Sequence, residues 1–196
     1  GRAADIAMMA NFYSSGQVCT NGTRVFVHSS VMAEFQSLVL ERVGRIRLGD
    51  PLDPASFLGP MCSAGQRRTV QDYIRLGQAE GARLLCGGAE PPAGLTRGYY
   101  QRPTLFADVD NRMRIAQEEI FGPVLCLIPY RDEDEAVRLA NASPFGLSSA
   151  VWTASRERSL QLARRLRAGQ CFVNGAAFNY RAPFGGYKQS GNGREW

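Results

Sequence analysis

The amino-acid sequence predicts an α/β fold, a layered α/β/α domain with a mostly parallel sheet. Segments with apolar residues at helical spacing alternate with short apolar runs along the chain. The run PVLCLIPY (residues 123–130) is continuously apolar, which is typical of a strand buried on both faces. Residues 147–174 read as strand, helix and strand, the pattern of a right-handed parallel crossover.

Three helices and three strands are expected in the first part of the chain. The helices, which share apolar residues three and four apart, are expected at residues 4–13, 32–43 and 65–79. Ser29 or Ser30 can cap the second of them. The strands are expected at residues 24–27, 83–88 and 99–106. Pro103 lies inside the last one and predicts an edge strand, because proline lacks the N–H that a ladder needs.

The second part of the chain continues the alternation. After the buried strand, a helix with an acidic first turn is expected at residues 132–141, and a strand at 147–152. Ser155 is predicted to cap a helix that ends near Gly169, before a final strand at 170–174. No repeat and no internal boundary is evident, so the 196 residues are interpreted as one domain.

Composition excludes several classes of protein. The net charge is +5, but the arginines are scattered rather than gathered on one stripe, which argues against nucleic-acid binding. No apolar stretch is long enough to cross a membrane and no signal peptide is evident, so a cytoplasmic protein is expected. Five widely spaced cysteines with no CxxC pair, and one histidine, argue against a metal site and favour reduced thiols. That histidine, His28, ends an apolar run and is interpreted as a strand-end residue.

Cys19 lies in an unusual setting for a structural cysteine. The stretch SSGQVCTNGTR (residues 14–24) surrounds it with small and polar residues, which are typical of an exposed, tightly turned loop. A thiol reacts as its thiolate, so a reactive cysteine needs access and nearby dipoles or cations. Gly16 permits close backbone approach, and Arg24 is expected to add a positive field. A loop cysteine without a chemical role remains the alternative.

Two further stretches have a composition that suits a site. QEEIFGPV (residues 117–124) places two carboxylates before a buried strand, and one of them could accept two hydrogen bonds from a sugar diol. The two adjacent glutamates point in different directions in most backbones, so they are not expected to form an acid–base pair; plain solvated glutamates are the alternative. APFGGYKQSGNGRE (residues 182–195) is rich in glycine but matches neither phosphate-binding glycine motif, and a packed turn with a surface lysine is the simpler interpretation.

Taken together, these stretches resemble the NAD(P)-dependent aldehyde dehydrogenase family. FYSSGQVCTNGT resembles its cysteine signature, and EEIFGPV and PFGGYKQSG resemble two more of its stretches at similar separations. The resemblance covers essentially the whole chain and implies the catalytic domain of that family. It also implies that the dinucleotide-binding domain, the glutamate base, the oxyanion-hole asparagine and the C-terminal oligomerisation tail lie outside this chain, which is then truncated at both ends.

The resemblance implies a role for several residues. Cys19 would attack the aldehyde and carry a thiohemiacetal and then a thioester, while NAD or NADP takes the hydride. Glu119, Phe121 and Gln66 would contact the cofactor's nicotinamide and its ribose. Phe178, Tyr180 and Phe184 would line the aldehyde pocket. The stretch NGAAFNYRAPF (residues 174–184) is one residue shorter than the betaine-type pattern, so it does not indicate a trimethylammonium substrate.

Other expectations concern the whole protein. The partner implied is a small-molecule aldehyde, with no nucleic acid and no membrane, and a homodimer or homotetramer is expected at full length. The isolated chain is expected to be inactive. Two alternatives remain open: an acylating dehydrogenase that passes the thioester to coenzyme A, and a non-catalytic binding or structural relative.

Overall fold

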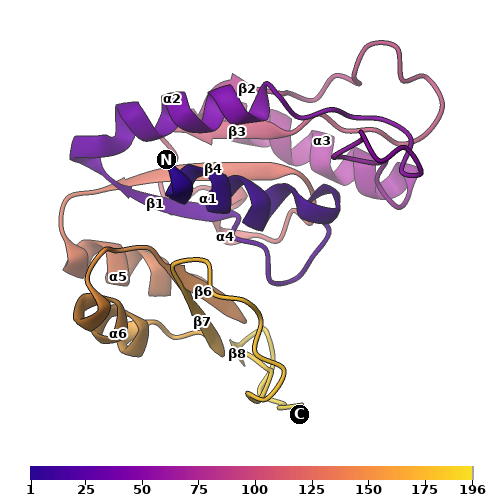
Figure 1. Cartoon of the computed structure of the whole chain (residues 1–196). Helices are drawn as coiled ribbons and strands as arrows, with labels where there is room; N and C mark the ends of the chain where they lie inside the picture. The colour runs from indigo at the N-terminus through magenta and orange to yellow at the C-terminus, as the bar shows by residue number, and fades with distance from the viewer. Residues whose placement is uncertain (196) are drawn as a thin grey trace. The chain divides into compact units, whose positions relative to one another are not determined.

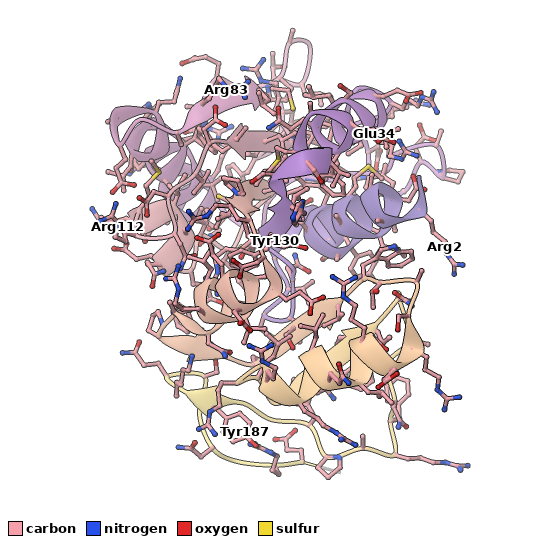
Figure 2. The ribbon with its side chains drawn as sticks, turned by 90° about the vertical axis from the view of Figure 1, so that its left-hand side faces the viewer. Arg2, Glu34, Arg83, Arg112, Tyr130 and Tyr187 are labelled. Carbon is pink, nitrogen blue, oxygen red and sulfur yellow. The ribbon has the colours of Figure 1, made fainter. Side chains whose placement is uncertain are left out.

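The computed structural model describes residues 1–195 (Figure 1). The chain divides into two compact units, unit 1 (Gly1–Pro129) and unit 2 (Tyr130–Trp196). Tyr130, labelled in Figure 2, is the first residue of unit 2. No shift in composition at this point of the sequence indicated the division. The assignment of all 196 residues to one catalytic domain stays a prediction.

The elements follow the predicted alternation in both units. In unit 1 the helices are α1 (Arg2–Phe12), α2 (Met32–Val43), α3 (Ala64–Ala79) and α4 (Arg114–Gln117), with 3₁₀ turns at Tyr13–Gly16 and Ser29–Val31. The strands there are β1 (Arg24–His28), β2 (Arg83–Cys86), β3 (Thr104–Ala107) and β4 (Val124–Tyr130), whose last residue opens unit 2. Unit 2 contains α5 (Glu133–Asn141), β5 (Phe145–Gly146), β6 (Ser148–Val151), α6 (Arg156–Arg165), β7 (Gln170–Val173) and β8 (Tyr187–Lys188).

The four-stranded sheet of unit 1 has the order β1-β4-β3-β2. β3 and β4 are parallel, with Thr104 opposite Val124, and β2 is antiparallel to β3. On one face Leu105, Leu125 and Leu127 are fully buried in a cluster with residues of α1 and α2 such as Phe12 and Val39. This cluster includes Ala4 and Phe12 of α1, so it fixes the position of the helix that precedes the Cys19 loop.

The opposite face of the sheet packs on α3 and α4. A methyl group at Gly77 of α3 would lie 3.2 Å from the Phe106 ring and 2.9 Å from Ile115 of α4, so only glycine allows this approach. The thiol of buried Cys126 on β4 donates to the carbonyl of Ile115 over 3.7 Å. Helices therefore cover both faces of the sheet, and the predicted layered α/β/α fold is confirmed.

The prediction that residues 99–106 form an edge strand is wrong. β3 begins at Thr104, after Pro103, and lies inside the sheet between β4 and β2. The N–H of Thr104 donates to the carbonyl of Pro123 at 2.8 Å and starts the ladder. Because Pro103 precedes the first ladder bond, its missing N–H costs the sheet nothing.

Two helix ends also differ from the prediction. α2 begins at Met32 without a side-chain cap, and His28 at the end of β1 accepts the Ser30 N–H at 3.2 Å instead. α6 ends at Arg165, four residues before Gly169. Asn141 accounts for this early end, because its amide donates to the Arg165 carbonyl at 2.8 Å and its oxygen accepts the Arg167 N–H at 2.7 Å.

Unit 2 contains two small sheets rather than one. β6 and β7 pair in parallel from Ser148 opposite Gln170 to Val151 opposite Val173, which confirms the parallel pairing expected for residues 147–174. Ser155 caps α6 between them, as predicted, by accepting the Arg158 N–H at 3.2 Å. β5 and β8 form a second, antiparallel pair that the sequence did not indicate. None of the helices within residues 1–195 combines the length and apolar composition that a membrane span requires.

Candidate active site

Cys19 occupies the second position of a tight turn. The N–H of Asn21 donates to the carbonyl of Val18 at 3.0 Å, which leaves Cys19 and Thr20 at the two central positions. The thiol is free and exposed. Within residues 1–195 the backbone N–H of Cys19 has no acceptor either. The turn thus presents a thiol and a free backbone donor next to each other.

The residues before Cys19 are packed against two other segments. Ser14, Ser15 and Gly16 all have positive φ angles, of 52°, 56° and 74°. This left-handed run brings Gly16 so close to Gly122 that a methyl group on Gly16 would lie 2.2 Å from the Gly122 carbonyl. The hydroxyl of buried Ser15 donates to the Gly59 carbonyl at 2.9 Å. The cysteine loop is therefore seated directly on the EEIFGPV stretch.

The residues after Cys19 are tied back to α1. The side-chain amide of Asn21 donates to the carbonyl of Asn11 at 2.9 Å, and the N–H of Gly22 donates to the carbonyl of Ala10 at 3.0 Å. Both acceptors belong to the last turn of α1, where helix carbonyls have no partner within the helix. The turn that carries Cys19 is consequently anchored on both sides.

Three of the other four cysteines are less exposed than Cys19, and Cys62 is exposed like it. All five are free, in agreement with the predicted reduced thiols. Burial raises the pKa of Cys126 to about 12, and burial also raises the pKa of Cys86 and Cys171, so these thiols stay protonated. Cys62 is exposed, and its backbone N–H donates to the side-chain oxygen of Gln17 at 3.0 Å.

Glu118 and Glu119 differ in their hydrogen bonds and exposure, in keeping with the prediction that these adjacent side chains do not form an acid–base pair. The Glu118 carboxylate accepts from Nε and Nη2 of Arg114 at 2.6 and 2.9 Å and from the hydroxyl of Tyr73 at 2.7 Å. These donors, Arg114 first, lower the pKa of Glu118 to about 2. Glu119 is exposed, and none of residues 1–195 donates a hydrogen bond to its carboxylate. Only Glu119 is free to bind a ligand.

Phe121 and Gln66 lie beside Glu119. Phe121 has a φ of 53°, which is rare for an aromatic residue and turns the chain sharply before β4. The side-chain amide of Gln66 donates to the carbonyls of Ile120 and Phe121, both at 3.0 Å. The amide N–H groups of Gln66 thus hold this backbone in place, and its direct contact with a cofactor stays a proposal.

Arg24 is the first residue of β1. Its guanidinium donates to Asn111 at 2.8 Å and lies 5.3 Å from the centroid of the Phe26 ring. Its charge also acts on the buried thiol of Cys126, whose pKa it lowers slightly against the larger effect of burial. The expected positive field of Arg24 at Cys19 stays a prediction.

The three predicted substrate residues form one aromatic cluster in unit 2. The ring centroid of Phe178 lies 4.9 Å from that of Tyr180, 5.9 Å from that of Phe184 and 6.2 Å from that of Phe172. Tyr180 is 75% exposed, while Phe178 and Phe184 are half-buried. The cluster offers ring faces suited to an apolar or cationic group.

The glycine-rich stretch holds one end of this cluster. A methyl group on Gly169 would lie 1.6 Å from the Gly185 carbonyl, so two backbones meet here. Lys188, the only lysine, donates to the carbonyls of Asn141 and Ser143 at 2.7 and 3.0 Å. Tyr187, labelled in Figure 2, has the guanidinium carbons of Arg167 and Arg194 each 4.9 Å from its ring centroid. This stretch is a packed turn, as predicted, and Lys188 donates to carbonyls at the end of α5.

Tyr73 and Arg114 both contact Glu118, and neither was predicted from the sequence to be a site residue. Tyr73 lies 45 positions away on α3, and no local pattern marks it. Arg114 is four residues before Glu118, a spacing at which opposite charges pair on a helix, and that signal was available.

A model of the aldehyde dehydrogenase family matches residues 1–196. Betaine aldehyde dehydrogenases from Brucella ovis and Brucella melitensis are 50% identical over 193 residues. The alignment covers 96% of this chain and 39% of those proteins, so the chain spans about two fifths of the length of the curated relatives it matches.

Solved structures agree with this match. A mutant of aldehyde dehydrogenase C from Pseudomonas syringae, crystallised with NAD+ and octanal, superimposes with a TM-score of 0.97 at 45% identity, over 99% of this chain and 40% of that one. An indole-3-acetaldehyde dehydrogenase with NAD+ gives 0.95 at 46% identity, over 99% and 39%. Betaine aldehyde dehydrogenase from Staphylococcus aureus with NAD+ gives 0.95 at 36% identity, over 98% and 39%.

Proposed function

The chain belongs to the aldehyde dehydrogenase family, and we propose that it supplies the nucleophile of an enzyme that oxidises an aldehyde to a carboxylic acid with NAD or NADP. The observation that carries the proposal is the seating of the Cys19 loop on the Glu119 stretch through Gly16 and Gly122. A nucleophile and a free carboxylate on neighbouring segments suit a reaction between a bound aldehyde and a bound cofactor.

Cys19 performs the covalent steps in this proposal. Its thiolate bonds to the carbonyl carbon, and the carbonyl oxygen becomes an oxyanion that the free N–H of Cys19 can stabilise. When the C=O bond re-forms, a hydride leaves the carbon and a thioester remains. Water then releases the acid and returns the thiol. Sulfur suits both halves of the reaction, because it attacks well and later leaves well.

Cofactor binding is proposed for residues 118–122 of unit 1. NAD or NADP, when bound there, would supply the acceptor for the hydride. Glu119 is exposed and not engaged by any of residues 1–195, so its two oxygens suit the two hydroxyls of a ribose. Phe121 offers an apolar face for the nicotinamide side, and Gln66 holds the backbone of both Ile120 and Phe121.

The aldehyde pocket is proposed to include Phe178, Tyr180 and Phe184. Their ring faces suit an apolar chain or a cation equally well. Betaine aldehyde, octanal and indole-3-acetaldehyde, named for the relatives and structures above, therefore form the first panel for the full-length protein. We also propose that the 196-residue chain alone turns over little aldehyde, since it spans 39% of its curated relatives.

The decisive test is Cys19→Ser in the full-length protein, with Cys62→Ser as the control. Cys62 is also exposed and lies near the same loop through Gln17, so it matches Cys19 in setting but not in role. We expect Cys19→Ser to lower NADH production by at least about a thousandfold, because a missing nucleophile removes the whole covalent route. The Cys62→Ser variant should keep nearly full activity.

Several outcomes would contradict the proposal. Equal activity of the Cys19→Ser and parent proteins would show that Cys19 is not the nucleophile. Product that forms only when coenzyme A is added, as an acyl-CoA, would favour the acylating alternative. A full-length protein that neither binds a nicotinamide cofactor nor oxidises any aldehyde of the panel would favour the non-catalytic relative.

A further inference from the structure

The segment that carries Glu119 belongs to neither a helix nor a strand. α4 ends at Gln117 and β4 begins at Val124. The N–H of Glu118 still donates to the Arg114 carbonyl at 2.8 Å, and the Pro123 carbonyl accepts from Thr104 at 2.8 Å, so residues 119–122 are the part of this segment that belongs to neither element. A free carboxylate on such a segment would be mobile unless other parts of the chain held it. Binding a ligand would then carry the entropy cost of ordering the segment.

One face of α3 holds the residues on both sides of Glu119. Gln66, Val70 and Tyr73 lie at positions i, i+4 and i+7, which is one stripe of a helix. Gln66 holds the carbonyls of Ile120 and Phe121, and Val70 packs so tightly on Gly122 that a methyl group there would lie 2.3 Å from Val70 Cγ2.

Tyr73 completes this stripe at Glu118. Its hydroxyl donates to one carboxylate oxygen at 2.7 Å while Arg114 donates to both oxygens. The Tyr73 ring is half-buried, so its hydroxyl is held in place by packing. Side chains of α3, together with Arg114, thus contact four residues of this segment: Glu118, Ile120, Phe121 and Gly122. Glu119 is the residue between them that they do not contact.

We propose that Tyr73 and Glu118 are positioning residues that set the geometry of Glu119 for the nicotinamide cofactor. This inference rests on the proposed function, because it takes Glu119 to be the cofactor ligand. Tyr73 and Glu118 do not touch the cofactor themselves. Their effect is to limit residues 118–122 to the conformation in which the Glu119 carboxylate faces outward.

The test compares Tyr73→Phe with Tyr100→Phe in the full-length protein. Tyr100 is a matched control, because its part-buried hydroxyl also makes one hydrogen bond, to the Gly49 carbonyl at 3.1 Å, and it has no contact with Glu118. The measurements are the dissociation constant of NADH by fluorescence, the KM and kcat for NAD, and the melting temperature without cofactor.

We expect Tyr73→Phe to raise the dissociation constant and the KM about five- to tenfold, with kcat at saturating NAD within about twofold of the parent. This is less than the full value of a hydrogen bond to a charged group, because Arg114 still donates to both Glu118 oxygens in the variant. Tyr100→Phe should leave both cofactor constants unchanged while lowering the melting temperature to a similar degree. Glu118→Gln, which still accepts from Tyr73, should bind NADH better than Glu118→Ala. Adding Tyr73→Phe to Glu118→Ala should weaken binding no further.

Two results would overturn the inference while leaving the proposed function intact. One is that the parent protein binds NADH and the Tyr73→Phe variant binds it with equal affinity. The other is a Tyr100→Phe variant that weakens binding as much as Tyr73→Phe, since the effect would then be general stability. A parent protein that does not bind NADH would instead refute the proposed function, and this inference with it.

Discussion

Different kinds of interaction stabilise the inside of unit 1 and the inside of unit 2. Among the described residues, every buried hydrophobic side chain except Val137 lies in unit 1. Unit 2 relies on polar contacts at its surface, such as the ion pair of Arg165 with Asp134 at 2.6 Å and the hydrogen bonds of Asn141 to the end of α6. Surface ion pairs contribute little each, whereas buried apolar side chains contribute about 1.5–3 kcal/mol each.

The residues proposed for catalysis and cofactor binding lie in unit 1, and those proposed for the aldehyde lie in unit 2. Cys19, Gln66 and Glu119 lie on segments that pack against the core of unit 1, so their geometry follows from the sheet and its helices. The cluster of Phe178, Tyr180 and Phe184 rests on ring contacts and on hydrogen bonds of exposed residues. The residues proposed for the chemistry therefore belong to the unit with the buried core, and the residues proposed to select the aldehyde belong to the unit with few buried side chains.

The largest expected effect tests the core of unit 1 directly. Leu125→Ala removes a fully buried side chain of β4 and should lower the free energy of unfolding by about 2–5 kcal/mol, through lost burial and the cavity left behind. The control is Leu160→Ala in α6, where the side chain is 48% exposed and the loss should stay within about 0.5 kcal/mol. Urea titration of each variant measures both values. Equal losses in the two variants would show that the units do not differ.

The next effect tests how the cysteine loop is seated. Gly16→Ala places a methyl group 2.2 Å from the Gly122 carbonyl at a φ of 74°, so it should lower the free energy of unfolding by about 2–3 kcal/mol and slow Cys19 alkylation or make it heterogeneous. Gly22→Ala lies in the same loop, but its methyl group would meet Ala10 at an ordinary 3.6 Å. Iodoacetamide labelling with mass spectrometry compares Cys19 in the two variants. A Gly16→Ala protein as stable as Gly22→Ala would contradict the close contact.

A smaller effect on stability is expected in the aromatic cluster. Phe178→Ala removes three ring contacts worth about 0.5–1.5 kcal/mol each, and because the Phe178 ring is only half-buried it should lower the melting temperature by less than Gly16→Ala does. In the full-length protein the same variant should change the ratio of kcat/KM between octanal and betaine aldehyde by about tenfold or more, because the pocket loses a ring face. Tyr99→Ala, an exposed aromatic residue of unit 1, is the control and should leave that ratio unchanged. An unchanged ratio for Phe178→Ala would place the substrate elsewhere.

The smallest effect is the response of both units to acid. The pKa of Glu118 in unit 1 is lowered to about 2 by Arg114 and Tyr73, and that of Glu135 in unit 2 is lowered to about 2 by Arg131. Because the folded-state pKa lies below the ordinary value of 4.5, each carboxylate stabilises the fold above pH 4.5 and loses this contribution as the pH falls toward 2.

Glu118→Gln and Glu135→Gln should therefore flatten the fall of the unfolding free energy between pH 4.5 and 2. Chemical denaturation at a series of pH values measures this slope for each variant and for the parent. A parent protein whose stability rises as the pH falls through this range would contradict both assignments.

Much of the fold could be predicted from the sequence because its local patterns were strong. The apolar run of β4 predicted a buried strand, and Ser155 predicted the start of α6. Both predictions are confirmed. The edge placement of β3 was wrong because strand order depends on which segments pair across the sheet, and Pro103 carries no such information. The early end of α6 depends on Asn141, which is distant in sequence.

Candidate site residues divide in the same way. Cys19 and Glu119 lie in local motifs that can be identified from a few neighbours. Tyr73 could not be found, because a tyrosine on an amphipathic helix has the same local pattern whether or not it meets a carboxylate 45 residues away. The contact of Gly16 with Gly122 was also hidden, since a glycine next to serines only indicates a turn.

The sequence by itself determined the α/β alternation, the exposed cysteine turn and the family, because these depend on residue types within short windows. The sequence offered one signal that Glu118 rather than Glu119 is engaged, the spacing of four residues from Arg114. Only the tertiary structure brought Tyr73 of α3 to the same carboxylate and left Glu119 exposed. The physical reason is that a hydrogen bond forms only between groups that the whole chain has brought within about 3 Å, and the packing of helices on a sheet decides which groups these are.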